Sequence, residues 1–571
     1  MESVIGMIRY KFESANKINI VWCLLILLTM LVLAILHHRW KYYEKEMKRW
    51  RQMCFIPLLI TFVHYLIYVS GAPFLLSDYT PMYLIAVLAL LPMICSFSKK
   101  GYRVTAVAAG AISVYFGLHF CTSWANVHNF SRQSYSKSFH SLAKEMGKSY
   151  VLTEWKDIDI AELEKKYMPM VKEAEKAEDP AKFEEAVTMF CNEFHDGHIS
   201  VHADYDFEKY PSSFVLRDYG LSMVKLDSGE VIAVCTTEEA NKLGISDGTV
   251  ITEWDGKPVL QTVKEMAADN EQAVLANAER DALFELAGTG GERVDVSFID
   301  SSGKEQTVTL SALEEEGTYD EAIDAFLHNT EQRRDLMMSN YSTKMLDDKC
   351  GYLMLTAEST GGQIRDELAA YTGKCSWARK VFRKKLRSLR EQGMEYLIID
   401  MRNNMGGIGE IGYELCGLLS SEERYATGFG VRKNGEYVRI CEHHIQGNGE
   451  FADIKAVVLT NYNCISAGDS TAFCLSKLPN VTLAGITDPN GSAQMSGGGC
   501  VLSDGVVGVL FPVYLTVNEA GEPDIDPKAD RISRDPCEVR IPLDLDAAMK
   551  IFRDKEDYEL EWAVKYLEDN E

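Results

Sequence analysis

The hydrophobic pattern divides this chain into two unlike parts. Within the first 130 residues, four apolar runs follow one another, each near the roughly 17–25 residues that cross a bilayer. The runs are Ile18–Leu36, Met53–Leu76, Pro81–Phe97 and Val104–Thr122. The last two are short and rich in Ala and Gly, so two buried helices are the alternative for them. Four runs in succession favour a bundle of four transmembrane helices in residues 1–130.

Basic residues in the connections predict the orientation of this bundle. The connection after the first run carries Arg39, Lys41, Lys45, Lys48, Arg49 and Arg51, and the third carries Lys99, Lys100 and Arg103. The second connection, Gly71–Thr80, has none. Because short basic loops stay in the cytoplasm, we expect a multi-pass cell-membrane protein whose larger C-terminal part is extracytoplasmic. Three basic residues of the N-terminal tail, Arg9, Lys11 and Lys17, oppose this orientation.

The remainder has three further patterns. Residues 131–212 show helical spacing and predict a helical cap, whereas residues 213–311 show short alternating strands separated by turns. In residues 312–571, apolar strands alternate with amphipathic helices, which predicts an α/β domain that ends in an acidic helix over Leu543–Glu571. The predicted strands are Gly351–Leu355, Tyr396–Asp400, Ala456–Leu459 and Thr482–Ile486, and the predicted helices are Gln363–Tyr371, Lys380–Gln392, Gly409–Leu419 and Ser470–Leu478.

Charge and cysteine usage narrow the functional classes. The chain carries a net charge of −25, although its first 130 residues hold 12 basic and five acidic side chains. The remainder is therefore strongly acidic, which argues against nucleic-acid partners. The 14 cysteines lack paired short spacing, so they predict neither a metal site nor a disulfide pattern. No cofactor is expected.

A strand–turn–helix segment carries the best candidate nucleophile. The β-branched run Ala456–Thr460 ends in a small-residue turn, and Ser466 lies in that turn before a predicted helix. Backbone N–H groups at a helix N-terminus favour developing negative charge. Ser466 as an ordinary helix cap is the alternative. A second strand ends in paired glycines, Gly406 and Gly407, whose N–H groups approach an oxyanion without a Cβ in the way.

These two segments resemble the carboxy-terminal processing (tail-specific) serine peptidases. The family pattern is D-x-R-x-N-x-G-G after a strand, followed about sixty residues later by S-A-x-E/D, and here it reads Asp400–Gly407 and Ser466–Asp469. The resemblance covers residues 140–545. It implies a crotonase-like ββα catalytic domain, Ser466 as the nucleophile, and an oxyanion hole formed by the N–H of Ala467 with that of Gly406 or Gly407.

This chain departs from the family at the general base. Many members carry a lysine in a T-x-G-K-G-x-x-Q block, but the matching block Thr487–Gln494 has Asn490 at that position. Lys477 lies about 16 Å along the helix from Ser466 and is too far away. A subset of the family carries D-G-H and uses a serine–histidine–acid arrangement. Asp196–His198 matches that motif, which implies His198 as the base. A metal site formed by His195, His198 and His202 is the weaker alternative, because Gly197 discourages the helical spacing it needs.

The acid that would orient His198 is not resolved by the sequence. The family places it near the end of the catalytic domain, in the region corresponding to Val513–Pro527. Asp526 lies nearest the family position and Glu522 is the second candidate.

Residues 213–311 resemble a PDZ domain. The stretch Gly248–Val259 is similar to the PDZ pattern G-D-x-I-x-x-I-D-G-x-x-V. The resemblance implies that the loop of Gly220, Leu221, Ser222 and Met223 receives a C-terminal carboxylate, with the peptide added as an edge strand. A β domain without a ligand is the alternative.

The combined prediction is a membrane-anchored, extracytoplasmic serine endopeptidase that cleaves polypeptides near their C-termini. Its expected partners are polypeptide tails and, through four spans, the membrane. The alternative from another class is a membrane-anchored, peptide-binding pseudoenzyme, in which Asn490 marks the loss of catalysis.

Overall fold

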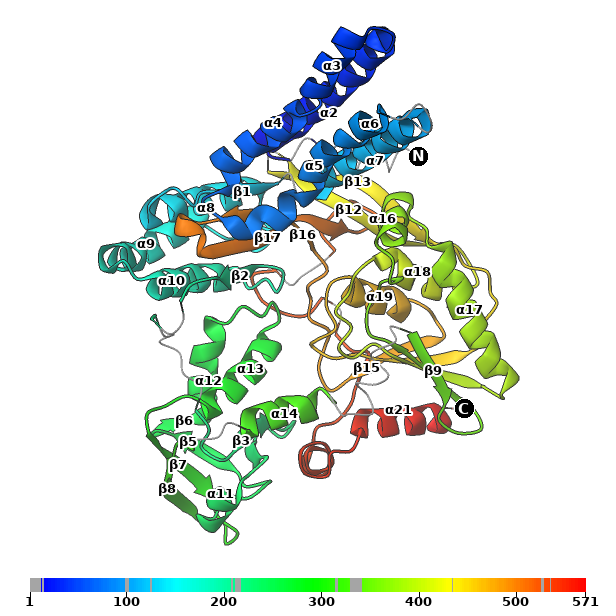
Figure 1. Ribbon diagram of the computed structural model, residues 1–571. Coiled ribbons are helices and arrows are strands. Elements are labelled where there is room, and N and C mark those ends of the chain that lie inside the picture. The colour runs from blue at the N-terminus through cyan, green and yellow to red at the C-terminus, as the bar shows by residue number, and fades with distance from the viewer. Residues whose placement is uncertain are drawn as a thin grey trace.

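A helical bundle stands on one end of a mixed α/β body, with a small β domain at the other end (Figure 1). The structure, a computed structural model, describes residues 12, 15–97, 102–123, 126–206, 209–210, 217–313, 317–328, 341–433, 435–524, 528–534 and 536–570.

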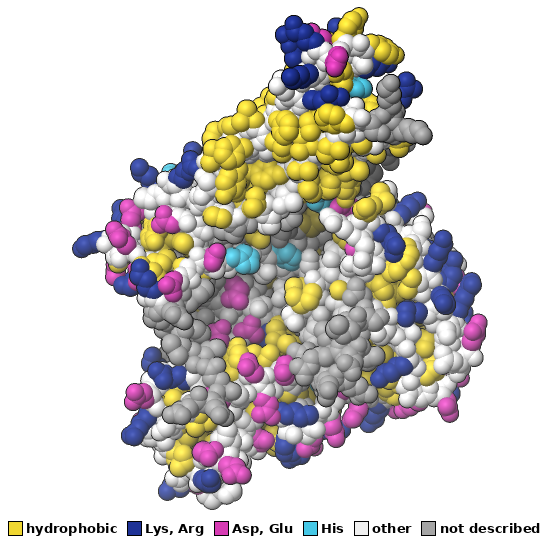
Figure 2. Space-filling view, viewed as in Figure 1, with side chains coloured by type: hydrophobic (Ala, Val, Ile, Leu, Met, Phe, Trp, Pro, Cys, Tyr) yellow, Lys and Arg dark blue, Asp and Glu magenta, His cyan; other side chains and the backbone are white. Residues whose placement is uncertain are grey.

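The bundle contains four helical segments that are long and apolar enough to cross a membrane: Lys17–Trp40, Glu44–Val69, Leu76–Cys95 and Tyr102–Thr122. This agrees with the four predicted runs. Apolar side chains cover the outside of the bundle (Figure 2). Its elements are α2 (Lys17–Trp40), α3 (Glu44–Met53), α4 (Ile56–His64), η1 (Tyr65–Val69), η2 (Pro73–Leu75), α5 (Leu76–Leu88), α6 (Leu90–Cys95) and α7 (Tyr102–Ser123).

The described residues of the first and third connections lie together at the end of the bundle that is remote from the α/β body. Arg51 on α3 donates from Nε to Ser96 Oγ at 3.0 Å, which joins the first connection to the third. Lys and Arg side chains gather at this end (Figure 2). At the opposite end, Asn126 donates from Nδ2 to the Gly497 carbonyl at 2.7 Å. The described residues of these connections therefore lie at the end of the bundle away from the body. The side of the membrane on which the body lies stays a prediction.

A first sheet joins segments that are distant in the sequence. Its strand order is β1-β16-β17-β12-β13, and β2 pairs with the other edge of β17. The helical cap packs on this sheet through a shared apolar core. The strands are β1 (Val127–Asn129), β2 (Ser200–Ala203), β12 (Arg424–Lys433), β13 (Glu436–Ile445), β16 (Met495–Val501) and β17 (Val507–Val517); η3 is Ser503–Gly505, and the cap helices are α8 (Tyr135–Ser149), α9 (Ile160–Ala177) and α10 (Pro180–Asn192).

The small β domain follows the cap. A four-stranded sheet of order β6-β5-β7-β8 and a β3-β4 pair enclose an apolar core with three helices. The elements are β3 (Ser222–Lys225), β4 (Val231–Val234), α11 (Glu238–Lys242), β5 (Ile251–Trp254), β6 (Lys257–Pro258), α12 (Val259–Ala268), α13 (Leu275–Ala287), β7 (Arg293–Ile299) and β8 (Glu305–Ser311).

The α/β part contains a second sheet of order β18-β15-β14-β11-β10-β9, parallel except at β9. All five residues of β11 (Tyr396–Asp400) are buried, as expected for a central parallel strand covered on both faces. The other strands are β9 (Tyr341–Met345), β10 (Cys350–Leu355), β14 (Lys455–Leu459), β15 (Val481–Gly485) and β18 (Val539–Arg540), and the helices are α14 (Thr318–Phe326), α16 (Gln363–Thr372), α17 (Ser376–Glu391), α18 (Gly409–Leu419), α19 (Ala467–Ser476), α20 (Leu545–Ala548), η4 (Met549–Arg553) and α21 (Tyr558–Asp569).

Two sequence-based expectations need correction. The acidic tail is not one helix, because the chain leaves the helical path at residues 554–557 between η4 and α21. The helix expected over Ser470–Leu478 begins three residues earlier, at Ala467, so that Ser466 directly precedes its first turn. The second correction brings the candidate nucleophile closer to the N–H groups of the helix start.

Candidate active site

Ser466 occupies a strained turn between β14 and α19. Its φ of 59° and ψ of −125° are unfavourable for a residue with a Cβ, at a cost of about 1–3 kcal/mol. The neighbouring chain holds this conformation: Ser466 N donates to the Ser492 carbonyl at 2.7 Å, and Ile465 N donates to the Asn404 carbonyl at 2.9 Å. A strained strand-to-helix turn that presents a serine is the geometry of a nucleophile elbow. Ser466 Oγ makes no hydrogen bond with any described residue.

The glycine loop after β11 packs directly against this turn. A Cβ on Gly406 would lie 2.7 Å from Ser466 Cβ and 2.8 Å from Ala467 N. Gly407 has a φ of 133°, and a Cβ there would lie 2.3 Å from the Glu358 carbonyl oxygen. Both positions therefore exclude every larger residue, which explains the paired glycines physically.

The backbone N–H groups near Ser466 differ in whether they already donate a hydrogen bond. Gly406 N donates to Asn404 Oδ1 at 2.8 Å and is already satisfied. In contrast, the Ala467 and Gly407 N–H groups donate to no acceptor within the described residues. Of the two predicted glycine donors, Gly407 is thus the one that is free to bind an oxyanion together with Ala467.

His198 reaches this site through Ser492. His198 Nδ1 lies 2.5 Å from Ser492 Oγ, and the Ser492 carbonyl accepts the Ser466 N–H. One residue therefore contacts both members of the predicted Ser466–His198 pair. Ser492 was not among the sequence-based candidates, although it lies in the block where the family lysine was sought. A neutral imidazole that donates from Nδ1 to Ser492 keeps Nε2 as a proton acceptor.

Burial sets the electrostatics of His198. Loss of hydration lowers the pKa of His198 below its usual 6.5, while the Asp196 carboxylate opposes that shift and Lys156 adds to it. The imidazole is therefore neutral at neutral pH, which is the form that accepts a proton.

The carboxylate that acts on His198 comes from its own D-G-H motif. Asp196 is buried and accepts hydrogen bonds from His198 N at 2.9 Å, from Tyr150 Oη at 2.7 Å and from Gln494 Nε2. Asp196 holds the backbone of His198 and does not contact its ring in the way a triad acid would. The motif residues were visible in the sequence, but the position of this carboxylate follows from the fold.

A second buried carboxylate, Asp469, orders the Ser492 segment. Its Oδ2 accepts from Gly491 N at 2.6 Å and from Ser492 N at 3.0 Å. Burial raises the pKa of Asp469, whereas Arg534 and the two N–H donors lower it. Asp469 is the last residue of the S-A-x-E/D motif, so this motif holds Ser466, the candidate nucleophile, and the Ser492 segment that contacts His198 together.

Asn490 occupies the position of the family lysine, and its side chain is held by hydrogen bonds to two neighbouring residues. Its Nδ2 donates to Gln272 Oε1 at 3.2 Å and to the Tyr462 carbonyl at 3.1 Å. Its Oδ1 is 3.1 Å from where a Cβ on Gly197 would lie. Asn490 therefore connects the β domain, through Gln272, to the D-G-H segment.

Of the two predicted triad acids, Glu522 does not contact His198. Glu522 is exposed, and its carboxylate accepts from Asn518 Nδ2 at 3.2 Å within a turn. The ring contact that Glu522 was expected to make is made by Ser492. Asp526 lies outside the described residues.

The three-histidine alternative has no support in the geometry. His195 Nδ1 contacts the Asn270 carbonyl at 2.7 Å, and His202 contacts Ser200. Over the described part of the chain, no group of three His, Cys, Asp or Glu side chains is placed to hold a metal ion.

The predicted peptide-binding loop of the β domain is closed in this structure. Gly220 N donates to Asp218 Oδ1 at 2.7 Å, and Leu221 and Met223 belong to the apolar core. The Ser222 hydroxyl is buried, with no hydrogen bond to any described residue. Capture of a carboxylate by this loop would require these contacts to open, and it stays a prediction.

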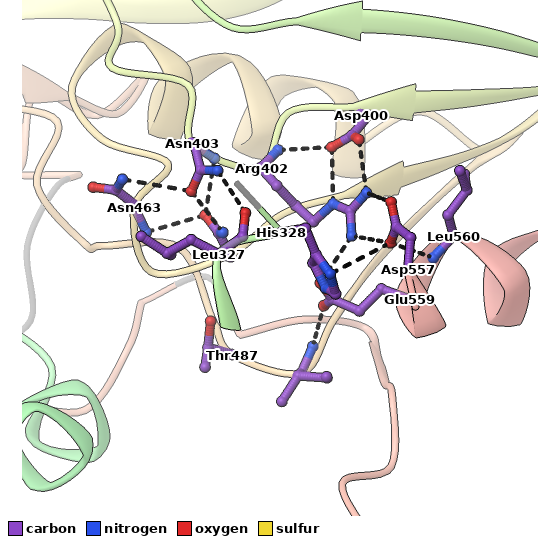
Figure 3. A network of polar contacts seen from close by, with 12 residues as sticks. Leu327, His328, Asp400, Arg402, Asn403, Asn463, Thr487, Asp557, Glu559 and Leu560 are labelled. Atoms are coloured by element: carbon purple, nitrogen blue, oxygen red, sulfur yellow. Dashed lines mark hydrogen bonds and ion pairs between the residues drawn. The ribbon is translucent and has the colours of Figure 1, made fainter. Parts of the chain in front are cut away.

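A fully buried arginine fixes the loop that carries the glycines (Figure 3). Arg402 donates to both oxygens of Asp400 at 3.0 and 2.8 Å, to both oxygens of Asp557 at 2.7 and 2.9 Å, and to Glu559 Oε2 at 3.1 Å. His328 contacts the same Glu559 oxygen at 3.1 Å. The β11 end, the start of α21 and the segment after α14 therefore share one network.

Asn403 continues this network towards Ser466 (Figure 3). It adopts a φ of 60°, donates from Nδ2 to the Leu327 carbonyl at 2.9 Å, and exchanges two hydrogen bonds with Asn461. Because Asn461 starts the turn that leads to Ser466, Asn403, which lies at a variable position within the D-x-R-x-N stretch, ties both strand ends together.

Comparison with known proteins identifies the class of this site. Residues 350–521 match peptidase family S41, and this stretch of the chain is a peptidase family S41 domain. It contains Ser466 and the glycine loop, whereas His198 precedes it. No curated protein sequence matches the chain.

Solved structures place more of the chain in a known fold. The crystal structure of mature CPAF is 14% identical, with a TM-score of 0.50, over 75% of this chain and 96% of that one. The photosystem II D1 C-terminal processing protease is 16% identical, with a TM-score of 0.33, over 75% and 98%. A putative peptidase from Parabacteroides merdae is 14% identical, with a TM-score of 0.42, over 76% and 97%. The similarity to mature CPAF shows a shared fold.

Replacing Arg402 by Ala is expected to destabilise the folded protein severely. Removing one partner from a buried ion pair costs about 3–5 kcal/mol, because the remaining charges stay buried and unpaired. Here three carboxylates would lose their common cation. Thermal unfolding of the purified Arg402→Ala protein should show a clearly lower melting temperature than that of the unmodified protein. Arg402→Lys should melt between these two temperatures, because lysine keeps the positive charge but loses the two-pronged hydrogen bonding of the guanidinium to each carboxylate.

The matched control is Arg553→Ala, which removes an arginine from an exposed contact with Asp554. Its melting temperature should equal that of the unmodified protein. An Arg402→Ala protein that melts like the Arg553→Ala protein would contradict the proposed role of the network.

Proposed function

We propose that this protein is a membrane-anchored serine endopeptidase that acts outside the cytoplasm and cleaves polypeptides near their C-termini. One observation carries the proposal: the strained Ser466 turn adjoins the Ala467 and Gly407 N–H groups, which have no acceptor among the described residues, and its own N–H donates to Ser492, whose hydroxyl contacts His198. The S41 domain supports serine-peptidase chemistry.

In the proposed reaction, Ser466 Oγ attacks the scissile carbonyl carbon while His198 Nε2 takes the hydroxyl proton. Negative charge develops on the carbonyl oxygen, and the Ala467 and Gly407 N–H groups stabilise it. His198 then gives the proton to the leaving amine as the C–N bond breaks. Water, activated by the same imidazole, hydrolyses the acyl-enzyme and restores Ser466.

Ser492 takes the position on Nδ1 that an acid occupies in a serine–histidine–acid triad. A neutral hydroxyl fixes the tautomer of His198 but stabilises its charged form less than a carboxylate does. The arrangement therefore supports a slower peptidase than one with an acid on Nδ1.

The alternative function is a peptide-binding pseudoenzyme. Asn490 favours it, because an amide replaces the family's basic lysine and is held by Gln272 and Tyr462. The two functions differ in whether Ser466 reacts.

Replacing Ser466 by Ala is expected to abolish peptide cleavage, because the acyl-enzyme cannot form. Loss of a serine nucleophile in a related mechanism lowers kcat by about 10^6-fold. The measurement is cleavage of a peptide library by the purified full-length protein, followed by mass spectrometry. Ser476→Ala, at the other end of α19, is the control and should cleave normally. Unchanged cleavage by Ser466→Ala would remove Ser466 from the mechanism.

The pH dependence tests His198 as the base. Because burial lowers the pKa of His198, the neutral form persists below pH 6.5, so kcat/KM should be constant near neutral pH and decline only in more acidic solution. His198→Ala should lower kcat by about 10^2–10^4-fold. Ser492→Ala and Asn490→Ala should cost less.

His202→Ala is the matched control, since His202 is an exposed histidine on the neighbouring strand. It should leave both rate and pH profile unchanged. A profile that rises only at alkaline pH, or a fully active His198→Ala protein, would point to a different base.

The extracytoplasmic placement predicts which surface sites are labelled from outside the cell. A cysteine at Ser302, in an exposed turn of the β domain, should react with a membrane-impermeant maleimide in intact cells. A cysteine at Tyr42, 82% exposed beside the basic α3 helix, should react only after permeabilisation. The native cysteines are all buried or half-buried, which keeps the background low. The reverse labelling pattern would invert the topology.

A further inference from the structure

Helix α16 exposes two large aliphatic side chains. Ile364 is 61% exposed and Leu368 is 57% exposed, whereas Ala369 on the other side of the helix is buried. Residues four apart in a helix lie on the same face, one above the other. The α16 helix therefore carries a short apolar ridge that no described part of the chain covers.

The same helix contacts the transmembrane bundle directly. Tyr115 on α7 donates from Oη to Glu367 Oε2 at 3.0 Å, and His119 Nδ1 pairs with Glu367 Oε1 at 2.9 Å. Figure 1 shows α16 at the side of the α/β body that faces α7. Glu367 adjoins Ile364 and Leu368 on the helix surface, since it is three residues from one and next to the other. The apolar ridge thus borders the face that meets the bundle.

The position of this contact along α7 can be calculated from the geometry of an α-helix. The α7 helix has 22 residues, about 33 Å at 1.5 Å per residue, which is close to the roughly 30 Å of bilayer hydrocarbon. Tyr115 and His119 lie eight and four residues before its last residue, Ser123, so they are about 12 and 6 Å from that end. The neighbouring Val114 and Leu118 are 55% and 47% exposed and belong to the apolar outer surface of the bundle.

We propose that α16 is an interfacial helix whose ridge, Ile364 and Leu368, is inserted in the lipid leaflet on the catalytic side of the membrane. Both contacting helices carry exposed apolar side chains, Val114 and Leu118 on α7 and the ridge on α16, so lipid around the bundle would cover both. The Glu367 carboxylate is satisfied by Tyr115 and His119, which removes the cost of an unpaired charge at that depth.

This placement connects the membrane surface to the oxyanion loop. Glu358, which precedes α16, pairs with the glycine loop: Glu358 N donates to the Gly406 carbonyl at 2.8 Å, and its carbonyl accepts from Ile408 N at 2.7 Å. Between Glu358 and α16, Thr360 N donates to Asp366 Oδ1 at 2.8 Å and fixes the start of the helix. Glu358, which contacts the glycine loop, is therefore only six residues from Ile364 and ten residues from Leu368.

A catalytic site held this close to the membrane favours substrates that are themselves attached to the membrane. Resting on the proposed peptidase function, we infer that the substrates are polypeptide segments that emerge from the same membrane, such as the tails of membrane proteins. A substrate anchored in the bilayer reaches such a site at high effective concentration, whereas a soluble peptide of the same sequence does not.

The lipid contact is tested without any reference to activity. A nitroxide on cysteine at position 364 or 368 of the full-length protein, in nanodiscs of phosphatidylcholine and phosphatidylglycerol, should collide with oxygen and lose collisions with a water-soluble nickel chelate. A nitroxide at position 275, where Leu275 is 40% exposed on the distant β domain, is the control and should collide freely with the chelate. Equal collisions with the chelate at positions 364, 368 and 275 would overturn the proposal.

The substrate inference has its own test. The double variant Ile364→Glu/Leu368→Glu should lower kcat/KM by about tenfold on a peptide anchored in the same nanodisc. It should leave kcat/KM on the soluble peptide unchanged, which also shows that the variant is folded. An equal effect on both substrates would overturn membrane selection. If the unmodified protein cleaves neither peptide, the peptidase function fails, while the collision data still decide the lipid contact.

Discussion

The burial of Arg402 is the constraint on which the rest of the catalytic part depends. A guanidinium with no exposed surface needs compensating carboxylates, and it finds them on β11, at the start of α21 and on α21 itself. Strand β11 and helix α21 are more than 150 residues apart in the sequence. Since the same loop continues through Asn403 and Asn404 to the paired glycines, the charge balance in the interior also helps to fix the position of the Gly407 N–H, the proposed oxyanion donor.

The block that carries the lysine in many family members contacts His198 through a different residue in this chain. The lysine position is occupied by Asn490, and a different residue of the same block, Ser492, contacts the imidazole. The buried Asp469 carboxylate holds that block against the Ser466 turn. Ser492 thus links His198, the proposed base, to Ser466, the proposed nucleophile, through one side-chain and one backbone contact.

Much of the architecture could be predicted from local sequence pattern. The four N-terminal apolar segments and the buried parallel strands are long or strongly apolar, and they were predicted correctly as helices and as strands. Ser466 and Gly407 could be proposed because strand ends and glycines are recognisable in a sequence. The roles assigned to them remain predictions until activity is measured.

Other features required the fold. Strands β1 and β16 of the first sheet were missed because β1 has three residues and β16 contains three consecutive glycines, so neither shows apolar alternation. Strand β1 is defined by its long-range pairing with β16. Ser492 could not be identified, because its contact with His198 depends on how residues 487–494 fold in space and not on a recognisable spacing of residues in the sequence. Leu221 and Met223 read as pocket residues in a PDZ-like pattern, yet the apolar core of the β domain buries them.

The most direct measurement is the mapping of a covalent adduct. The purified full-length protein is treated with a fluorophosphonate, digested and analysed by mass spectrometry. The account predicts that the phosphonate is found on the peptide containing Ser466, and that His198→Ala lowers the rate of its formation. An unmodified Ser466 in a folded protein, after prolonged treatment at neutral pH, would contradict the account and favour a pseudoenzyme.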